Sequence, residues 1–469
     1  MVEKPPEGTE SLWIAVGPGR YAAPYAIGQS LLFIPFDMAS YLLERYSSQP
    51  LKEHLPWLPI GLGLLPLLGV GYWLALRRLL QVWGLPHPWP TIGALVVMLG
   101  SMMFFYAGQA QEETLVALCL TLATTCALNL RRSATWKNAL GAGLFAGACL
   151  TIRPVSLFAL LVVPPLLISL RTTWSIRLRL LAVAALGVAA VNSISLLHNV
   201  ARFGSAFTIG YERMGHFSKL AIDLRWPQTL LSLLFGPGGG LLVLSPVLLL
   251  SFAGWRRLWQ SDRAYAIGLL ASLVSCYSFF SGWHDSHTGG STWGTRYEAH
   301  LLGLFAIPVT IGLKRLAESS RGSKLAIVIL SISVGIQGLS VFATHHLEPF
   351  QTSCDGAGEA RLLNSPLEGQ LALRVKNVAR WALGKGPPSV GNPGCLPTMA
   401  TIWDRYVPNF WGPVYAHRLG ASGNWVMVAW SLIGLTALAA LATGLRKVLQ
   451  PLYRASKPGD GGTAGSRLM

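Results

Sequence analysis

The chain has 469 residues, of which 52% are hydrophobic and 12% are charged, and its formal net charge is +17 at pH 7. Its apolar residues come in runs of roughly 18 to 25, the length that crosses a bilayer as a helix, and these runs lack the alternation of a membrane barrel. The positive charge does not indicate nucleic-acid binding, because Lys and Arg lie at the ends of apolar runs rather than in one patch. The sequence therefore predicts an all-α polytopic membrane protein.

The amino-terminal segment, residues 1–56, precedes the clear membrane spans and shows no signal peptide. Within it, Pro24 to Glu44 is apolar but carries Pro35 and Asp37 in its middle. We interpret this stretch as an interfacial or re-entrant segment on the outer side of the membrane rather than as a span.

Windows of about 20 apolar residues predict roughly eleven spans in the rest of the chain. These spans are expected near residues 57–76, 91–107, 114–130, 138–152, 154–170, 180–199, 239–254, 264–282, 299–313, 325–343 and 423–444. Basic turns follow every second span, at Arg77-Arg78, Arg131-Arg132, Arg171 to Arg179, Arg256 to Arg263, Lys314 to Lys324 and in the tail 445–469. The positive-inside rule assigns these turns to the cytoplasm.

The opposite turns are then outer loops, at residues 108–113, 152–154, 200–238, 283–298 and 344–422. They lie around a membrane core at 57–343 and hold most of the acidic residues. If the span at 57–76 begins outside, the amino terminus also lies outside unless Pro24 to Glu44 crosses the membrane, and a chain that begins outside normally needs an earlier span. Either Pro24 to Glu44 then crosses the membrane, or the reading frame begins one helix too late.

Cysteine positions agree with this topology. Cys119, Cys126, Cys149 and Cys276 lie inside predicted spans, where thiols act as small hydrophobic groups. Cys354 and Cys395 lie in the long outer segment 344–422, where an oxidising compartment favours a disulfide over two free thiols.

Two adjacent acids, Glu112 and Glu113, stand at the outer start of the span near Thr114. They are candidates for a general base or for ligands of a divalent cation. The alternative is that they begin a helix, where negative charge complements the macrodipole.

Arg153 lies in LTIRPVS, at the outer turn between two apolar runs. A guanidinium offers a fork that matches phosphate oxygens, so a lipid phosphate is one expected partner. The alternatives are that the side chain reaches the headgroups or pairs with a loop carboxylate.

Glycines surround one proline in FGPGGGLLVLSP, at Gly236 and Gly238 to Gly240. They allow the backbone to approach a ligand or another helix closely, or to re-enter the membrane in a tight turn. The segment is not a nucleotide-phosphate loop, because no Lys-Ser or Lys-Thr follows it.

The stretch WHDSHTGGSTWGTRYE, residues 283–298, is a polar island between two apolar runs. Its His284, Asp285 and His287 either bind a metal ion or make ordinary loop hydrogen bonds. Its aromatic residues either stack on sugar faces or anchor the loop at the membrane interface.

Four stretches together resemble a known family, and they read GRYAAPYAIGQSLLFIPFD, HNVARFGSAFTIGYE, FGPGGGLLVLSPVLLL and SGWHDSHTGGSTWGTRYEAHLL. They are similar to a bacterial family of multi-span membrane proteins related to the protein O-mannosyltransferases and to other GT-C glycosyltransferases, which use polyprenyl-phosphate sugars. The resemblance covers about residues 17 to 345. Its last segment, with Trp293-Gly294 and Arg296-Tyr297, is the most specific.

The resemblance implies an outward-facing cavity in the inner membrane of a bacterium, where a sugar passes from a polyprenyl-phosphate donor to an acceptor on the non-cytoplasmic side. It also implies that Pro24 to Glu44 lies along the membrane. In such enzymes the catalytic acid, usually an aspartate, follows the first span. Here no Asp precedes Asp37, so either the start lies further upstream or this acid is absent.

Glycosyl transfer to a hydroxyl needs a carboxylate base and cationic or metal help for the leaving phosphate. The candidate catalytic residues are Asp285, Glu113, Glu112 and Asp37. The candidate substrate-binding residues are Arg153, Arg296, Tyr297, His284, Trp293 and Tyr211.

Two other classes stay open. A transporter of a lipid-linked or small solute would show repeated span pairs and broken or charged helices near the bilayer midplane, and no clear repeat is visible. A non-catalytic family member would bind a lipid carrier or a partner protein. The outer segment 344–422 is expected either to bind the acceptor or to form a structural lid.

Overall fold

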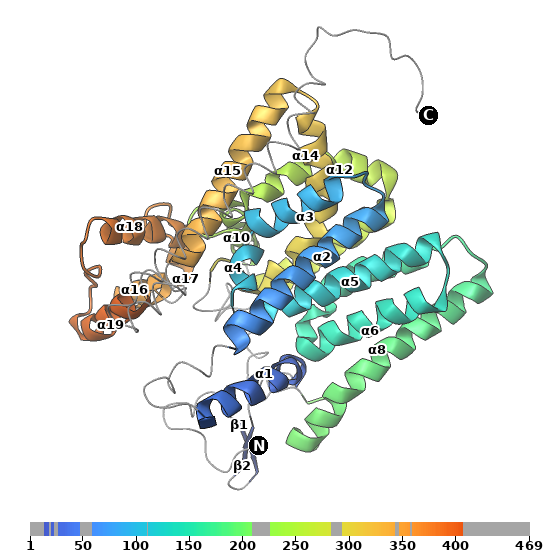
Figure 1. Ribbon diagram of the computed structural model, residues 1–469, viewed down its shortest axis with the longest axis horizontal. Coiled ribbons are helices and arrows are strands. Elements are labelled where there is room, and N and C mark those ends of the chain that lie inside the picture. The colour runs from blue at the N-terminus through green and yellow to red at the C-terminus, as the bar shows by residue number, and fades with distance from the viewer. Residues whose placement is uncertain are drawn as a thin grey trace.

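The computed structural model describes residues 14–17, 20–22, 27–46, 59–109, 111–208, 226–282, 293–342, 347–356 and 359–406. These residues are almost entirely helical (Figure 1). The exception is an antiparallel ribbon of β1 (Ile14–Gly17) and β2 (Arg20–Ala22). For the part of the chain that is described, the predicted helical class is confirmed.

The first half of the chain supplies helices up to the long α8. In order these are α1 (Ile27–Tyr46), the π-helix η4 (Pro59–Leu64), α2 (Leu65–Trp83), α3 (Trp89–Gly100), α4 (Met103–Ala107), α5 (Glu113–Arg132), α6 (Trp136–Ile152), the 3-10 turns η5 (Pro154–Leu157) and η6 (Ala159–Val162), α7 (Val163–Ile168) and α8 (Trp174–Phe203).

The second half completes the bundle and adds a group of shorter helices. In order these are α10 (Trp226–Phe235), α11 (Leu241–Leu244), η8 (Pro246–Leu249), α12 (Leu250–Ser261), α13 (Arg263–Ser281), η9 (Arg296–Phe305), α14 (Ala306–Ala317), α15 (Ser320–Phe342), α16 (Leu347–Cys354), α17 (Glu359–Asn364), α18 (Gln370–Ala382), η10 (Pro393–Cys395) and α19 (Leu396–Tyr406).

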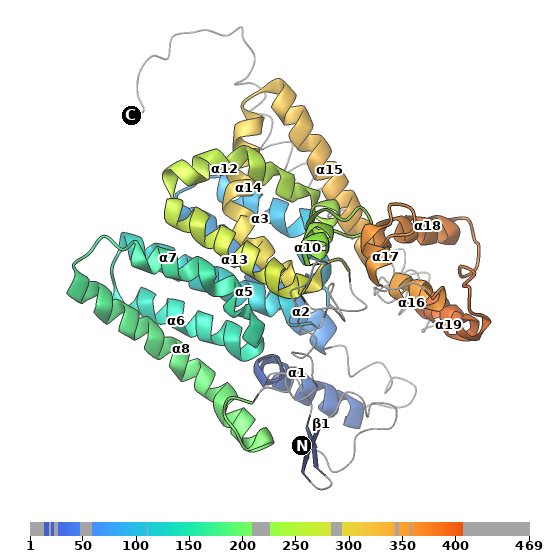
Figure 2. The ribbon, with the colours of Figure 1, turned by 180° about the vertical axis from the view of Figure 1, so that it is seen from behind.

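Within the described residues, five helical units are long and apolar enough to cross a membrane: α5, α8, α13, α15 and the continuous unit η9–α14. The units α5 and η9–α14 are mostly buried, whereas only a small part of α8 and of α15 is buried. Figures 1 and 2 show α8 and α15 on opposite flanks of the bundle. Apolar faces on peripheral helices fit a lipid environment, because the surface of a water-soluble protein rarely leaves such faces uncovered.

Two predicted spans, at 91–107 and 239–254, are each made of more than one helical segment. The first breaks at Ser101, between α3 and α4, and the second breaks at Ser245, between α11 and η8. The two breaks meet, because the backbone N–H of Met102 donates to Ser245 Oγ at 3.0 Å. A hydropathy window counts apolar residues and cannot detect a backbone group that is satisfied by a side chain from another segment.

The first predicted span ends later than expected. The run 57–76 becomes η4 followed by α2, and α2 continues past Arg77 and Arg78 to Trp83. Arg78 is exposed, and a long aliphatic stem allows an arginine to lie on an apolar helix while its charge reaches solvent. The predicted run at 423–444 lies outside the described residues.

The amino-terminal stretch predicted to be interfacial contains α1. Gly28 of α1 rests on Ile152 at the end of α6, where an added Cβ would lie 2.8 Å from the Ile152 backbone. Both views place α1 beside the same end of the bundle as the carboxyl end of α8 (Figures 1 and 2). Its Asp37 is exposed.

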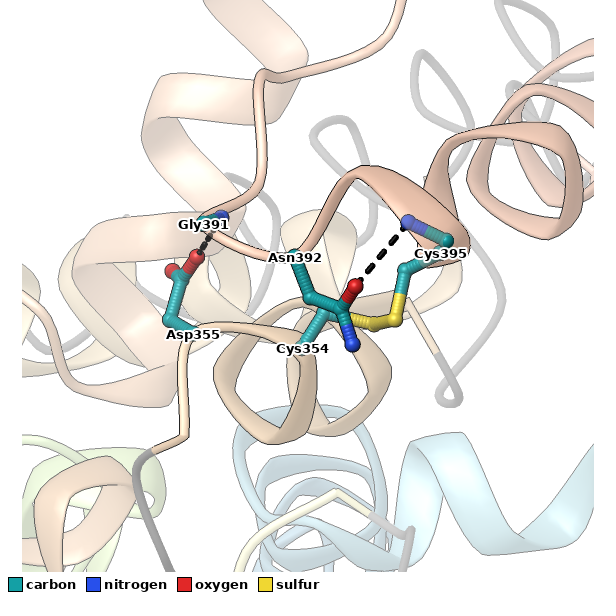
Figure 3. Close-up of a disulfide and its surroundings, with 6 residues drawn as sticks. Cys354, Asp355, Gly391, Asn392 and Cys395 are labelled. Atoms are coloured by element: carbon teal, nitrogen blue, oxygen red, sulfur yellow. Dashed lines mark hydrogen bonds between the residues drawn. A yellow bond between two sulfur atoms is a disulfide. The ribbon is translucent and has the colours of Figure 1, made fainter.

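The described residues of the segment 344–422 form helices α16 to α19, and α18 packs against α15. A disulfide joins Cys354 in α16 to Cys395 in η10, which confirms the predicted pairing (Figure 3). The Asp355 carboxylate accepts a hydrogen bond from Gly391 N at 2.6 Å, so the two sides of the disulfide are also joined by polar contacts.

The glycine-rich turn packs against this outer segment. Gly238 N donates to Leu363 O at 2.9 Å, and Gly238 O accepts from Leu371 N at 3.0 Å. A Cβ on Gly238 would lie 2.3 Å from Leu362 O, so only glycine fits. Of the expected roles, the structure therefore shows close approach to another helical segment.

Candidate functional site

Four charged residues from distant parts of the sequence meet at one end of the helical core. Glu112 and Glu113 stand at the start of α5, Arg153 follows the last residue of α6, and Arg296 begins η9. Because α5 and α6 are antiparallel neighbours, the start of one helix lies beside the end of the other. We call Glu112, Glu113, Arg153 and Arg296 the charged cluster.

Glu113 is the centre of the charged cluster. Its Oε1 accepts a hydrogen bond from Arg296 Nε at 2.5 Å and lies 3.5 Å from Arg153 Nη1. The Glu113 side chain is completely buried, and its Oε2 has no hydrogen-bond partner among the described residues. Glu113 thus contacts two guanidinium groups, and the charges balance only with Glu112 included, since two carboxylates then face two arginines.

Glu112 is the more accessible of the two acids. Its Oε1 lies 3.3 Å from Arg153 Nε, and its side chain is 14% exposed. Burial raises the pKa of the Glu112 carboxyl above its ordinary value, an effect that the positive charge of Arg153 opposes. A carboxylate with a raised pKa that a ligand can reach is the group expected of a general base.

The two arginines differ in access. The Arg153 side chain is 5% exposed and the Arg296 side chain is 25% exposed. Arg296 and Glu112 are therefore the two members of the cluster with the most exposed surface, whereas Arg153 and Glu113 are the two most buried.

An aromatic stack fixes the Arg153 side chain. The rings of Phe280 and Tyr297 stack with centroids 4.6 Å apart, and the Arg153 guanidinium carbon lies 4.8 Å from the Tyr297 centroid. Such cation–π contact holds a guanidinium in one orientation. Tyr297 is half-buried, and within the described residues its ring face serves Arg153 and Phe280.

Trp293 is buried, which corrects the expectation of a sugar-stacking or interfacial ring. Its side chain has no exposed surface, and the Arg374 guanidinium carbon lies 4.8 Å from its ring centroid. Its carbonyl accepts a hydrogen bond from Tyr106 Oη at 2.7 Å. Trp293 is therefore an internal anchor, two residues before the fully buried Thr295 and three before Arg296.

Gly294 continues this anchor. Its N–H donates to Gln370 Oε1 at 2.8 Å. It has φ of +68°, and an added Cβ would lie 2.3 Å from Met102 Sδ. The backbone just ahead of Arg296 is therefore held by α4 and by α18, and only glycine suits it.

Two further titratable residues lie inside η9 and were not among the predicted site residues. Glu298 and His300 are buried, and neither the Glu298 carboxylate oxygens nor the His300 ring nitrogens have hydrogen-bond partners among the described residues. Buried ionisable groups in an apolar span are rare and tend to be functional. Their signal in the sequence was that Glu298 ends the polar island and that His300 follows it inside an apolar run.

The other predicted site residues are not brought into the charged cluster by the described structure. Asp37 is exposed on α1 and makes no ion pair with a described residue. His284, Asp285 and Tyr211 lie outside the described residues. Among the residues that are described, no group of three or more His, Cys, Asp or Glu side chains has the arrangement of a metal site.

The charged cluster can perform two chemical tasks. Glu112 can accept a proton from a hydroxyl, and the guanidinium groups of Arg296 and Arg153 can stabilise negative charge on phosphate oxygens. Comparison of the chain with models of known protein families and with characterised proteins finds no match for it.

Proposed function

We propose that the protein is a GT-C-type membrane glycosyltransferase, which moves a sugar from a polyprenyl-phosphate carrier to an acceptor on the non-cytoplasmic face. The observation that supports it is the charged cluster, in which an accessible carboxylate lies beside two arginines at the end of an apolar helical bundle. This is the pairing of base and phosphate-binding groups that transfer from a lipid phosphate requires.

In the proposed reaction, the acceptor hydroxyl attacks the anomeric carbon of the donor sugar. The bond from this carbon to the phosphate oxygen breaks as the new glycosidic bond forms. Glu112 takes the hydroxyl proton, and the phosphate leaves with its charge stabilised by Arg296 and Arg153. Glu113 keeps both guanidinium groups in place, because its Oε1 contacts each of them.

The proposed setting is the inner membrane of a bacterium, with the charged cluster facing outward and about eleven spans in all. Two features support this orientation. The cluster lies at the end of α5 opposite Arg131 and Arg132, and the disulfide between Cys354 and Cys395 lies beyond the end of α15. Basic turns favour the cytoplasm and disulfides favour an oxidising compartment.

The test is turnover of a polyprenyl-phosphate sugar by the full-length protein in proteoliposomes, with water as the hydroxyl that receives the sugar, measured as released polyprenyl phosphate so that the natural acceptor need not be known. We expect wild type to release it and Glu112→Gln to lose about 100-fold in rate, the range for a general base. Glu318→Gln, the same chemical change at an exposed site, should act as wild type. Binding without turnover by wild type would favour a non-catalytic carrier-binding protein.

One observation favours a second candidate, a transporter of a lipid-linked solute. Glu298 and His300 are buried in η9, and η9 is a 3-10 segment inside a candidate span. Charged groups and irregular helices inside the membrane are characteristic of transporters. Movement of the intact donor across the bilayer, abolished by Glu298→Gln but unaffected by Glu112→Gln, would select this candidate.

A further inference from the structure

A second polar site lies at the opposite end of α5 from the charged cluster. A cavity of about 340 Å³ is lined by residues that include Trp83, Arg131, Arg132, Ser169, Arg171 and Asp262. They come from the ends of α2, α5 and α12 and from the connection between α7 and α8. The 20 residues of α5 separate this cavity from the charged cluster by about 30 Å, so the two sites are independent.

Charge in the cavity is not balanced. Asp262 is the acid among the lining residues, and both of its oxygens are engaged. Its Oδ2 accepts from Arg131 Nη1 at 2.6 Å, and its Oδ1 accepts from Tyr265 N at 3.1 Å at the start of α13. Arg132 and Arg171 make no ion pair within the part of the chain that the structure describes.

Arg132 reaches across the cavity toward α2. Its Nη2 lies so near Gly84, the residue that follows α2, that a Cβ there would be 3.1 Å away. Arg171 lines the cavity from the connection after α7. The two guanidinium groups thus line the same cavity from different elements, and each can donate to one anionic group between them.

Three exposed tryptophans lie at the same end of the bundle as this cavity. Trp136 and Trp174 stand at the starts of α6 and α8, Trp259 stands near the end of α12, and all three are exposed. Tryptophan is enriched where helices leave the hydrocarbon and enter the headgroup layer. The cavity therefore opens where phosphate groups of lipids are concentrated.

We propose that this cavity is a binding site for the phosphate group of an anionic phospholipid, held by Arg132 and Arg171. Its volume is within the range of small-ligand pockets. Basic pockets between helices at the cytoplasmic surface suit anionic headgroups. A lipid bound there would contact the ends of α2, α5 and α12. Its phosphate would also reduce the repulsion between the positive charges of Arg132 and Arg171. Free phosphate shares the same chemistry, and the experiment separates the two sources.

The test uses full-length protein purified in a neutral detergent. Binding of phosphatidylglycerol, phosphatidylcholine and inorganic phosphate is measured by native mass spectrometry and by the shift in thermal unfolding. We expect phosphatidylglycerol to bind and stabilise wild type, whereas phosphatidylcholine and millimolar phosphate do neither. The double variant Arg132→Gln/Arg171→Gln should lose at least about tenfold in affinity for phosphatidylglycerol.

The matched control is Arg256→Gln/Arg257→Gln, which removes two exposed arginines at the same end of the bundle but outside the cavity lining. It should keep wild-type affinity. An equal loss in this control, or no loss in the cavity variant, would overturn the proposal. Equal binding of inorganic phosphate would overturn the lipid as the source. If the double variant does not purify, Arg171→Gln alone gives the same comparison, because Arg171 lies outside any helix.

Discussion

Glu112 and Glu113 are neighbours in the chain, yet their surroundings differ. Glu113 is buried and contacts two arginines, whereas Glu112 contacts Arg153 and keeps some exposure. Two carboxylates in different environments can take different roles. We infer that Glu113 is a structural counter-ion and that Glu112 is the proton acceptor.

Replacement of Glu113 by Gln is expected to destabilise the protein by about 3 to 5 kcal/mol, because it leaves the buried Arg153 and the partly buried Arg296 without their shared carboxylate. Thermal unfolding in detergent measures this. Glu318→Gln is the control, since Glu318 is exposed. A loss no larger than that of the control would contradict the counter-ion role.

Glu112 makes activity and stability depend on pH in opposite directions. Burial raises the pKa of Glu112 in the folded protein. As the pH is lowered, donor turnover should therefore be lost at a higher pH than it would be with a glutamate of ordinary pKa. Its contribution to stability has the other sign: it is fully present below the unfolded pKa and is lost as pH rises through the folded pKa. The measurements are donor turnover and unfolding temperature from pH 4 to 8.

Glu112→Gln removes the titrating group, so both pH dependences should be flattened in the acid range. If the acid limb of residual turnover persists unchanged in this variant, another group is the proton acceptor.

The sequence identifies most of these residues singly. In a chain with few charges, Glu112, Glu113, Arg153 and Arg296 stand out because each lies beside an apolar run. Their meeting could not be predicted, because it depends on how α5, α6 and η9 pack. Trp293 was misinterpreted because an aromatic residue in a polar stretch carries no sign of its burial under Arg374.

Among the elements, α18 connects the outer segment to the bundle. Arg374 donates through Nε and Nη2 to the two oxygens of Glu348 at 2.7 Å each, and its Nη1 donates to Ser340 O at 2.8 Å. One side chain thus joins α18 to α16 and to the end of α15. With Gln370 on Gly294, α18 also holds the backbone that leads to Arg296.

Arg374→Met leaves a buried carboxylate unpaired, and Glu348→Gln leaves a buried guanidinium unpaired. Each is expected to cost about 3 to 5 kcal/mol, while the double variant should cost much less than the sum. Hydrogen exchange of α16 and α18, together with thermal unfolding, measures the effect. Strictly additive losses would show that the pair does not act as a unit.

The sequence predicts helix ends that are set by a change in composition. It does not predict helix ends that depend on hydrogen bonds between distant segments. The start of α5 and the end of α6 agree with the sequence within a few residues. The breaks at Ser101 and Ser245 escaped prediction, since they depend on a contact between them. The buried role of Arg374 escaped as well, although an arginine next to Leu373 on the inner face of an amphipathic helix is a usable signal.

At the scale of the whole molecule, the two ends of the bundle differ in charge. Acids and their arginines gather at one end of α5, and uncompensated arginines gather at the other. This asymmetry agrees with the positive-inside pattern that the sequence predicts. It separates the proposed reaction site from the proposed lipid site at the two ends of the bundle.

One cysteine introduced at each end of the bundle, in separate variants, tests the orientation. Lys385→Cys, beyond α18, should react with a membrane-impermeant maleimide in intact cells. Ser133→Cys, at the α5–α6 turn, should react only after permeabilisation. Both positions are exposed, so burial does not explain a difference. Labelling of Ser133→Cys alone in intact cells would reverse the topology.

The most direct test of the central claim is an experimental structure of the protein with polyprenyl phosphate bound. The charged cluster predicts that the phosphate lies within hydrogen-bonding distance of Arg296, with Glu112 on the side from which an acceptor enters. A phosphate bound elsewhere, with Arg296 still paired only to Glu113, would contradict the assignment of this cluster as the reaction site.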